Sequence, residues 1–129
     1  MPIVAINHVN LRAERALLEK LRDFYVDVVG LRVGERPPFD FHGYWLYLAD
    51  QAVLHLVDDA TAPKIGDPTS GTYDHVAFTC RDMAAFEQHL HDRGVHFWRT
   101  VVPGQRQTQI FLTDPAGNGV EFNFELDDR

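Results

Sequence analysis

Four residues of metal-ligating type stand in two matching pairs along the chain. His8 and His75 lie 67 residues apart, and each is flanked by an amide or carboxylate residue on one side and a valine on the other. His55 and Glu121 form a second pair with nearly the same offset, 66 residues. Imidazole nitrogens and a carboxylate suit borderline divalent ions. We therefore expect these four side chains to meet at one divalent metal between two halves of the chain.

The ligand types alone do not choose the ion. Zinc, nickel, iron(II), manganese and cobalt all accept such a set, and a six-coordinate ion would leave two positions open for water or substrate. His55 has an alternative role as a hydrogen-bonding group for the substrate. Glu121 is the only carboxylate of the set, so it is the expected catalytic residue for moving a proton, provided that it loosens from the metal. In the alternative, Glu121 is a fixed ligand and a metal-bound hydroxide is the base.

Side-chain alternation predicts where these residues point. Val120, Phe122 and Phe124 alternate along the last apolar stretch and must face a packed core, so Glu121 points the other way. The same alternation turns the three histidines away from the apolar face of their own stretches. If the two halves pair as a pseudo-symmetric sheet, the four side chains line the inside of a curved cleft.

The remaining histidines have no counterpart in the other half. We interpret them as loop, helix-surface and strand-edge residues: His42, His89, His91 and His96. Cys80 is the single cysteine, so no intrachain disulfide forms. It shares the face of Val76 and Phe78, which predicts a buried free thiol and not a nucleophile.

Substrate-contacting residues are less sharply indicated. Some of the aromatic rings on one expected strand should face the cleft. Apolar residues lie on both faces of that strand, so the sequence does not decide which rings these are: Tyr44, Trp45 and Tyr47. Alternate glutamines fit a polar cleft wall or an exposed edge equally: Gln105, Gln107 and Gln109. Four arginines are available for an anionic group or else belong to the solvated surface: Arg32, Arg36, Arg99 and Arg106.

The first half reads as strand, helix, strand, strand, strand. Residues 3–11 alternate as a strand, and apolar residues then recur at steps of three and four up to Val28, which predicts a helix. No clear N-cap precedes this helix, and Gly30 is a typical C-cap. The further strands of this half are predicted at residues 31–36, 44–48 and 52–57.

The second half repeats that order. After a strand at residues 73–80, Asp82 is the expected N-cap of a helix that ends at Gly94, 64 residues after its counterpart Gly30. Three more strands are predicted at residues 95–102, 106–113 and 119–126, with a tight turn at 114–118. The chain is therefore a duplicated βαβββ unit of the α+β class, in which two tandem modules form a curved mixed sheet around a metal cleft.

We expect one domain, residues 1–129, with module one at 3–57, a linker at 58–72 and module two at 73–126. The net charge of −7 and the absence of a basic run argue against nucleic acid and anionic membrane as partners. A small-molecule substrate remains the natural partner. The lone cysteine suits a reducing cytosol, and no signal peptide or membrane span is recognisable, so a cytoplasmic location is expected.

These stretches make the chain resemble the vicinal oxygen chelate superfamily, which includes glyoxalase I, fosfomycin-modifying thiol transferases, extradiol dioxygenases, methylmalonyl-CoA epimerase and bleomycin-resistance proteins. The resemblance runs from Ile6 to Phe124 and is carried by four segments, residues 7–9, 24–31, 74–78 and 114–121.

The family's metal positions match His8, His55, His75 and Glu121 one by one. At the position of His55, bacterial glyoxalase I typically carries a glutamate. The resemblance implies a metal-dependent lyase or isomerase of the glyoxalase type, which acts on a small carbonyl compound or thiol adduct through bidentate oxygen chelation.

The alternatives within the resemblance are an extradiol-type dioxygenase, a thiol transferase, and a non-catalytic binding protein of the bleomycin-resistance type. The four ligand-type residues favour an enzyme over a binder, because a binder does not need them. A homodimer is also expected, with the modules paired within one chain or exchanged between two.

Overall fold

The computed structural model describes residues 5–66, 73, 75–101 and 107–125. It divides the chain into two compact units, Met1–Pro68 and Thr69–Arg129, which are described one at a time below. Among the described residues, no helix has both the length and the apolar character that crossing a membrane requires.

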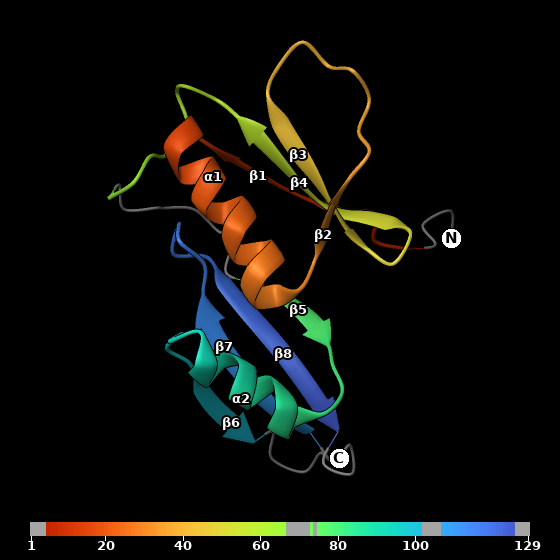
Figure 1. The fold of residues 1–129 in the computed structure, drawn as a ribbon, viewed down its shortest axis with the longest axis vertical. Coiled ribbons are helices and arrows are strands. Elements are labelled where there is room, and N and C mark those ends of the chain that lie inside the picture. The colour runs from red at the N-terminus through yellow and green to blue at the C-terminus, as the bar shows by residue number, and fades with distance from the viewer. Residues whose placement is uncertain (1–4, 67–72, 74, 102–106, 126–129) are drawn as a thin grey trace. The chain divides into compact units, whose positions relative to one another are not determined.

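Unit 1 contains one helical segment and a four-stranded mixed sheet (Figure 1). Its elements are β1 Val9–Ala13, α1 Arg15–Phe24, the π-helical turn η1 Tyr25–Val29, β2 Arg32–Gly34, β3 Gly43–Leu48 and β4 Gln51–Asp58. The strand order is β1-β4-β3-β2, with β1 parallel to β4 and the other pairs antiparallel.

Unit 2 repeats this plan. Its elements are β5 His75–Thr79, α2 Met83–Asp92, β6 Trp98–Val101, β7 Gln107–Thr113 and β8 Gly119–Glu125. The strand order is β5-β8-β7-β6, again with one parallel pair, β5 and β8. The prediction of an α+β fold with two tandem βαβββ modules is therefore confirmed.

The apolar face that periodicity predicted for the helix forms the core of unit 1. The apolar stripe of α1 and η1 is almost fully buried, and it packs against β1 and β4. Its buried members are Leu17, Leu18, Leu21, Tyr25 and Val28. In unit 2 the corresponding helix buries Leu90, while Phe86 lies against Phe122 and Phe124 of β8.

Two details at the helix ends differ from the prediction. Helix α1 does have an N-cap, because a carboxylate oxygen of Glu14 accepts a bond from the N–H of Ala16 at 3.3 Å. The last turn before Gly30 is a π turn, so that the N–H groups of Gly30 and Leu31 both reach the carbonyl of Tyr25. The two predicted helix signals are confirmed: Gly30 has a φ of 97°, and Asp82 caps α2.

The first strand begins later than predicted, at Val9 and not at residue 3, and His8 lies just before it. The reason lies in its partner strand. Val9 pairs with Leu54, and β4 carries a bulge at the next residue, Val53, because Leu46 pairs with Leu54 while Tyr47 pairs with Ala52. A bulge interrupts the regular ladder, so residues 5–8 have no continuous edge to join.

Close packing in unit 1 also fixes one glycine at the start of β3. A Cβ at Gly43 would lie 2.3 Å from the carbonyl oxygen of Leu56 on β4. That atom belongs to the backbone and cannot move aside easily. The sheet that carries His55 therefore requires glycine at this position.

Candidate metal centre

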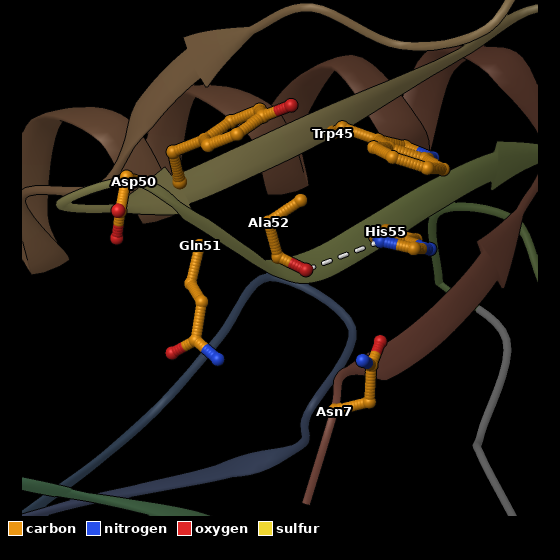
Figure 2. Close-up of a pocket in the computed structure, with 7 residues that line it drawn as sticks. Asn7, Trp45, Asp50, Gln51, Ala52 and His55 are labelled. Carbon is orange, nitrogen blue, oxygen red and sulfur yellow. Dashed lines mark hydrogen bonds between the residues drawn. The ribbon is translucent and has the colours of Figure 1, made fainter.

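Three rings form a continuous stack on unit 1. The ring of His55 lies parallel to the indole of Trp45, with centroids 4.1 Å apart and planes 6° apart. On its other side lies the ring of His8, at 3.8 Å and 14°. Trp45 and His55 are paired residues of β3 and β4, which places both side chains on one face of the sheet (Figure 2). The structure thus brings together the two predicted ligands of the first half.

Hydrogen bonds determine which ring nitrogens carry protons. Nε2 of His55 lies 3.2 Å from the carbonyl oxygen of Ala52, and a carbonyl can only accept, so this nitrogen is the protonated one. Nδ1 of His8 donates to Oδ1 of Asn7 at 2.8 Å. Each imidazole therefore keeps one nitrogen with a free lone pair, Nδ1 in His55 and Nε2 in His8. Metal-ligating histidines are usually held by an oxygen acceptor in this way.

The environment of His55 keeps its ring neutral. The residue is 9% exposed. Burial lowers the pKa of His55, and the neighbouring His8 and the positive charge of Arg36 lower it further. A neutral imidazole is the form that binds a metal ion.

The stack itself is not a ligating arrangement. The lone pair of an imidazole nitrogen lies in the plane of the ring, and two nearly parallel planes cannot both point at one ion. His8 is exposed and precedes β1, so its side chain is the one with room to rotate. Joint ligation by both histidines requires His8 to leave the stack.

Unit 2 brings together the two predicted ligands of the second half. Glu121 on β8 is 8% exposed, and its Oε1 lies 3.5 Å from Nε2 of His75 on β5. That separation is longer than the roughly 2.7 to 3.2 Å of an N–H···O hydrogen bond. It matches two ligands of one tetrahedral ion, whose donor atoms lie about 3.4 Å apart when each is about 2.1 Å from the metal. The distance between these two donor atoms is therefore that of two ligands of one divalent ion.

The second carboxylate oxygen of Glu121 is held by amides. Its Oε2 accepts from Nδ2 of Asn123 at 2.7 Å and from Nε2 of Gln109 at 3.2 Å. The sequence did not decide whether the glutamines of this strand line a polar cleft wall or lie at an exposed edge. Gln109 belongs to the polar surroundings of Glu121, while Gln105 lies outside the described residues.

Within the described part of the chain, no three histidine, cysteine, aspartate or glutamate side chains are clustered as a metal site would hold them. The observed groups are the two pairs. Ligation of one ion by His8, His55, His75 and Glu121 together stays a prediction.

A pocket of about 300 Å³ adjoins the ring stack of unit 1 (Figure 2). Its lining consists of Asn7, Trp45, Tyr47, Asp50, Gln51, Ala52 and His55. Sequence reasoning found the aromatic members but missed Asp50 and Gln51, which lie at the turn between β3 and β4. A polar turn carries no signal of its own that distinguishes a pocket wall from ordinary surface.

The third predicted aromatic residue, Tyr44, lies elsewhere. Its hydroxyl donates to Glu19 of α1 at 2.7 Å and accepts from Arg22 at 2.8 Å, so its ring faces the helix. His42 joins the same group through its Nε2, 3.1 Å from Glu19. Alternation along β3 therefore separates Tyr44 from Trp45, and the uncertainty about their faces is resolved.

The predicted arginines have structural partners where they are described. Arg36 lies over the rings of Phe39 and Phe41, and Arg99 pairs with Glu87. Arg32 donates to the carbonyl of Ala49, while Arg106 lies outside the described residues. Cys80 is half-buried, and burial raises the pKa of its thiol to about 11, which agrees with an unreactive thiol.

Comparison with known proteins places this architecture in a family. The model of the Glyoxalase/Bleomycin resistance protein/Dioxygenase superfamily matches residues 5–122, and the chain belongs to that superfamily. Glyoxylase I 4 of Arabidopsis thaliana is 27% identical over 124 residues, which are 92% of this chain and 70% of that protein.

Solved structures show the same fold. Lactoylglutathione lyase from Agrobacterium tumefaciens superposes with a TM-score of 0.68 at 24% identity, over 96% of both chains. The antibiotic-binding protein TnmS3 from a Streptomyces species superposes with a TM-score of 0.71 at 23% identity, over 97% of this chain and 98% of that one. Both an enzyme and a binding protein thus share this architecture, so the fold alone does not select the activity.

Proposed function

We propose that this chain is a metal-dependent lyase or isomerase of the glyoxalase type, which acts on a small carbonyl compound or thiol adduct. The observation that carries the proposal is the His75–Glu121 pair, because its 3.5 Å separation suits a shared ion. His8 and His55, with their tautomers set by Asn7 and the Ala52 carbonyl, complete the proposed ligand set. The divalent ion is zinc, nickel, iron, manganese or cobalt.

A divalent ion bound there would supply Lewis-acid stabilisation of negative charge on the substrate oxygens. The protein's own residues account for the rest of the chemistry. Glu121 is the carboxylate of the set, and its Oε1 is the oxygen that is not held by amides. We assign to Oε1, in the state in which it is not bound to the ion, the transfer of a proton from the carbon beside the substrate carbonyl to the carbonyl carbon, as general base and then general acid. Its low exposure keeps water from competing for that proton.

Turnover tests this function directly. The protein is loaded in turn with nickel, zinc and cobalt and assayed with the thiohemiacetal of methylglyoxal and a thiol. We expect turnover with at least one ion, and a loss of about a hundredfold or more in kcat for Glu121→Gln, because proton transfer by a positioned side chain contributes that much. His96→Ala is the matched control, since His96 has no counterpart in the other half of the chain.

Other outcomes separate the enzymes of the same superfamily. Oxygen uptake with a catechol in the presence of iron(II) would replace the lyase by an extradiol-type dioxygenase. Manganese-dependent addition of a thiol to an epoxide would replace it by a thiol transferase. Absence of every turnover under all metal loadings would contradict the enzyme proposal.

A binding protein is the second candidate, and the ring stack of unit 1 favours it. Trp45 and Tyr47 line a pocket beside a histidine pair that is stacked and not convergent. Quenching of Trp45 emission by an aromatic small molecule in the metal-free protein, without turnover of that molecule, would support this reading. Failure of the metal-free protein to bind any such compound would remove it.

The partners expected from the sequence belong to the same proposal. We propose a small-molecule substrate, a homodimer and a cytoplasmic location for this protein. Sedimentation of the purified protein tests the dimer, and a monomer at micromolar concentration would contradict it.

A further inference from the structure

A row of hydrogen-bonded polar side chains crosses the sheet of unit 2 and ends at Glu121. It begins at Thr100 on β6, whose Oγ1 donates to Oε1 of Gln109 on β7 at 3.1 Å. That bond leaves the NH₂ group of Gln109 turned toward β8. There its Nε2 donates to Oε2 of Glu121 at 3.2 Å and to Oδ1 of Asn123 at 3.1 Å.

Strand register explains why these residues meet. Thr100 pairs with Gln109 across β6 and β7, and Gln109 pairs with Asn123 across β7 and β8. Glu121 is two residues from Asn123 and therefore on the same face. Nδ2 of Asn123 donates to the same Oε2 of Glu121 at 2.7 Å.

The two amides donate hydrogen bonds to only one of the two carboxylate oxygens of Glu121. Oε2 accepts both amide bonds, whereas Oε1 faces Nε2 of His75. The terminal torsion of a glutamate is broad, so an unheld carboxylate would take a wide range of orientations. Hydrogen bonds to an ionised acceptor are strong, and two of them on one oxygen fix the plane of the carboxylate and direct the other oxygen toward His75.

We propose that Gln109 and Asn123 are positioning residues, which hold Oε2 of Glu121 so that Oε1 is the oxygen presented beside His75. Thr100 acts one step further away by fixing the orientation of the Gln109 amide. This role rests on the proposed function, because that function makes a divalent metal ion the partner of Oε1. The hydrogen-bonded row itself is a property of the metal-free protein.

Binding of Co²⁺ alone, followed by its visible absorption, tests the role in ligation. Gln109→Met and Asn123→Leu keep the side-chain size and remove the donors. We expect each to weaken Co²⁺ binding by about ten- to a hundredfold, the usual effect of removing an orienting group behind a metal ligand. Wild-type affinity and an unchanged spectrum in both variants would overturn the inference.

Two controls distinguish positioning from general damage to the sheet. Thr100→Ser keeps the hydroxyl and should bind as the wild type does, whereas Thr100→Val is the same size without it and should bind more weakly. Gln107→Met changes a glutamine on the same face of β7 with no hydrogen bond to Glu121 among the described residues, and should leave binding unchanged. Equal weakening by Gln107→Met and Gln109→Met would contradict the assigned role.

A second measurement does not need the metal. In the metal-free protein, the side-chain NH₂ signals of Gln109 and Asn123 in a ¹⁵N NMR spectrum should shift on Glu121→Ala, while that of Gln107 should not. Absence of those shifts would overturn the inference by itself. If the shifts appear and the wild type binds no Co²⁺, the hydrogen-bonded row stands, the proposed function fails, and a ligand-positioning role for the row fails with it.

Discussion

His55 donates from Nε2 to the carbonyl oxygen of Ala52, three residues earlier on its own strand, at 3.2 Å. The bond depends on the bulge in β4, where Val53 is the extra residue between two regular pairs. A bulge bends the strand and takes backbone groups out of the regular ladder. The backbone of unit 1 thus fixes which nitrogen of His55 is protonated, and Nδ1 remains free to accept.

The fluorescence of Trp45 should change when the His55 ring is removed. We expect His55→Ala to expose the indole, to shift its emission to longer wavelength, and to lower the free energy of unfolding by about 1 to 2 kcal/mol, because a stacked ring pair is lost. Fluorescence is excited at a wavelength selective for tryptophan in a Trp98→Phe background, which leaves Trp45 as the only tryptophan. An unchanged spectrum would show that the two rings are not stacked in solution.

Mutation of the turn before β8 should lower the free energy of unfolding strongly. Oδ1 of Asp114 accepts from the N–H groups of Ala116 and Asn118, each at 2.9 Å, and the residue is 4% exposed. Asp114→Ala would remove the acceptor of these two half-buried N–H groups and should cost about 1 to 2 kcal/mol in urea unfolding. Asp114→Asn keeps one acceptor oxygen and should cost less. Equal costs for both would contradict this assignment.

Glu19, which is hydrogen-bonded to Tyr44 and His42, should make the free energy of unfolding depend on pH under acidic conditions. Burial alone would raise the pKa of Glu19, but hydrogen bonds from Tyr44 and His42 and the charge of Arg22 outweigh it and lower the pKa. A carboxylate with a lowered pKa in the folded state stabilises the fold fully above its ordinary value, and this contribution is lost as the pH falls through the lowered one.

Thermal unfolding of Glu19→Gln checks this sign. We expect a lower Tm than that of the wild type at pH 7, with a difference that shrinks below about pH 4, where the wild-type carboxylate also becomes neutral. Tyr44→Phe removes one donor and should give a smaller effect of the same direction. A difference that grows toward acid would contradict the expected pH dependence.

Cys80 should react slowly with thiol reagents. A pKa of about 11 leaves little thiolate at pH 8, about two hundredfold less than in an unfolded chain, where a cysteine has a pKa near 8.5. Labelling with a disulfide reagent should therefore be far slower in the native protein than in denaturant. Cys80→Ala should retain turnover, and loss of turnover would contradict the reading of Cys80 as a structural thiol.

The sequence predicted the parts of the fold that depend on periodicity. Alternation along β8 gave Val120 and Phe122 to the core and Glu121 to the other face, and both are seen in the burial and contacts of that strand. The duplicated offsets matched His8 with His75 and His55 with Glu121 as equivalent positions of the two halves, and the structure places the two members of each half together, His8 on His55 and Glu121 beside His75.

What the sequence did not reveal depends on local backbone geometry and on contacts across strands. The bulge at Val53 has no glycine or other residue signal, so neither the late start of β1 nor the Ala52–His55 bond could be foreseen. Likewise, the amides on Glu121 follow from the register between β7 and β8. Alternation fixes the face of Gln109, but only the register places it opposite Asn123.

The proposed function depends on ligation of a divalent ion by His8, His55, His75 and Glu121, which the metal content at equilibrium measures. The purified protein is dialysed against zinc, nickel, cobalt, manganese or iron(II), and bound metal is measured by elemental analysis. We predict one ion per chain in the wild type, and substoichiometric metal in His75→Ala and Glu121→Gln, with His96→Ala unaffected. A wild type that holds no stoichiometric ion under any loading would show that these residues are not a metal site.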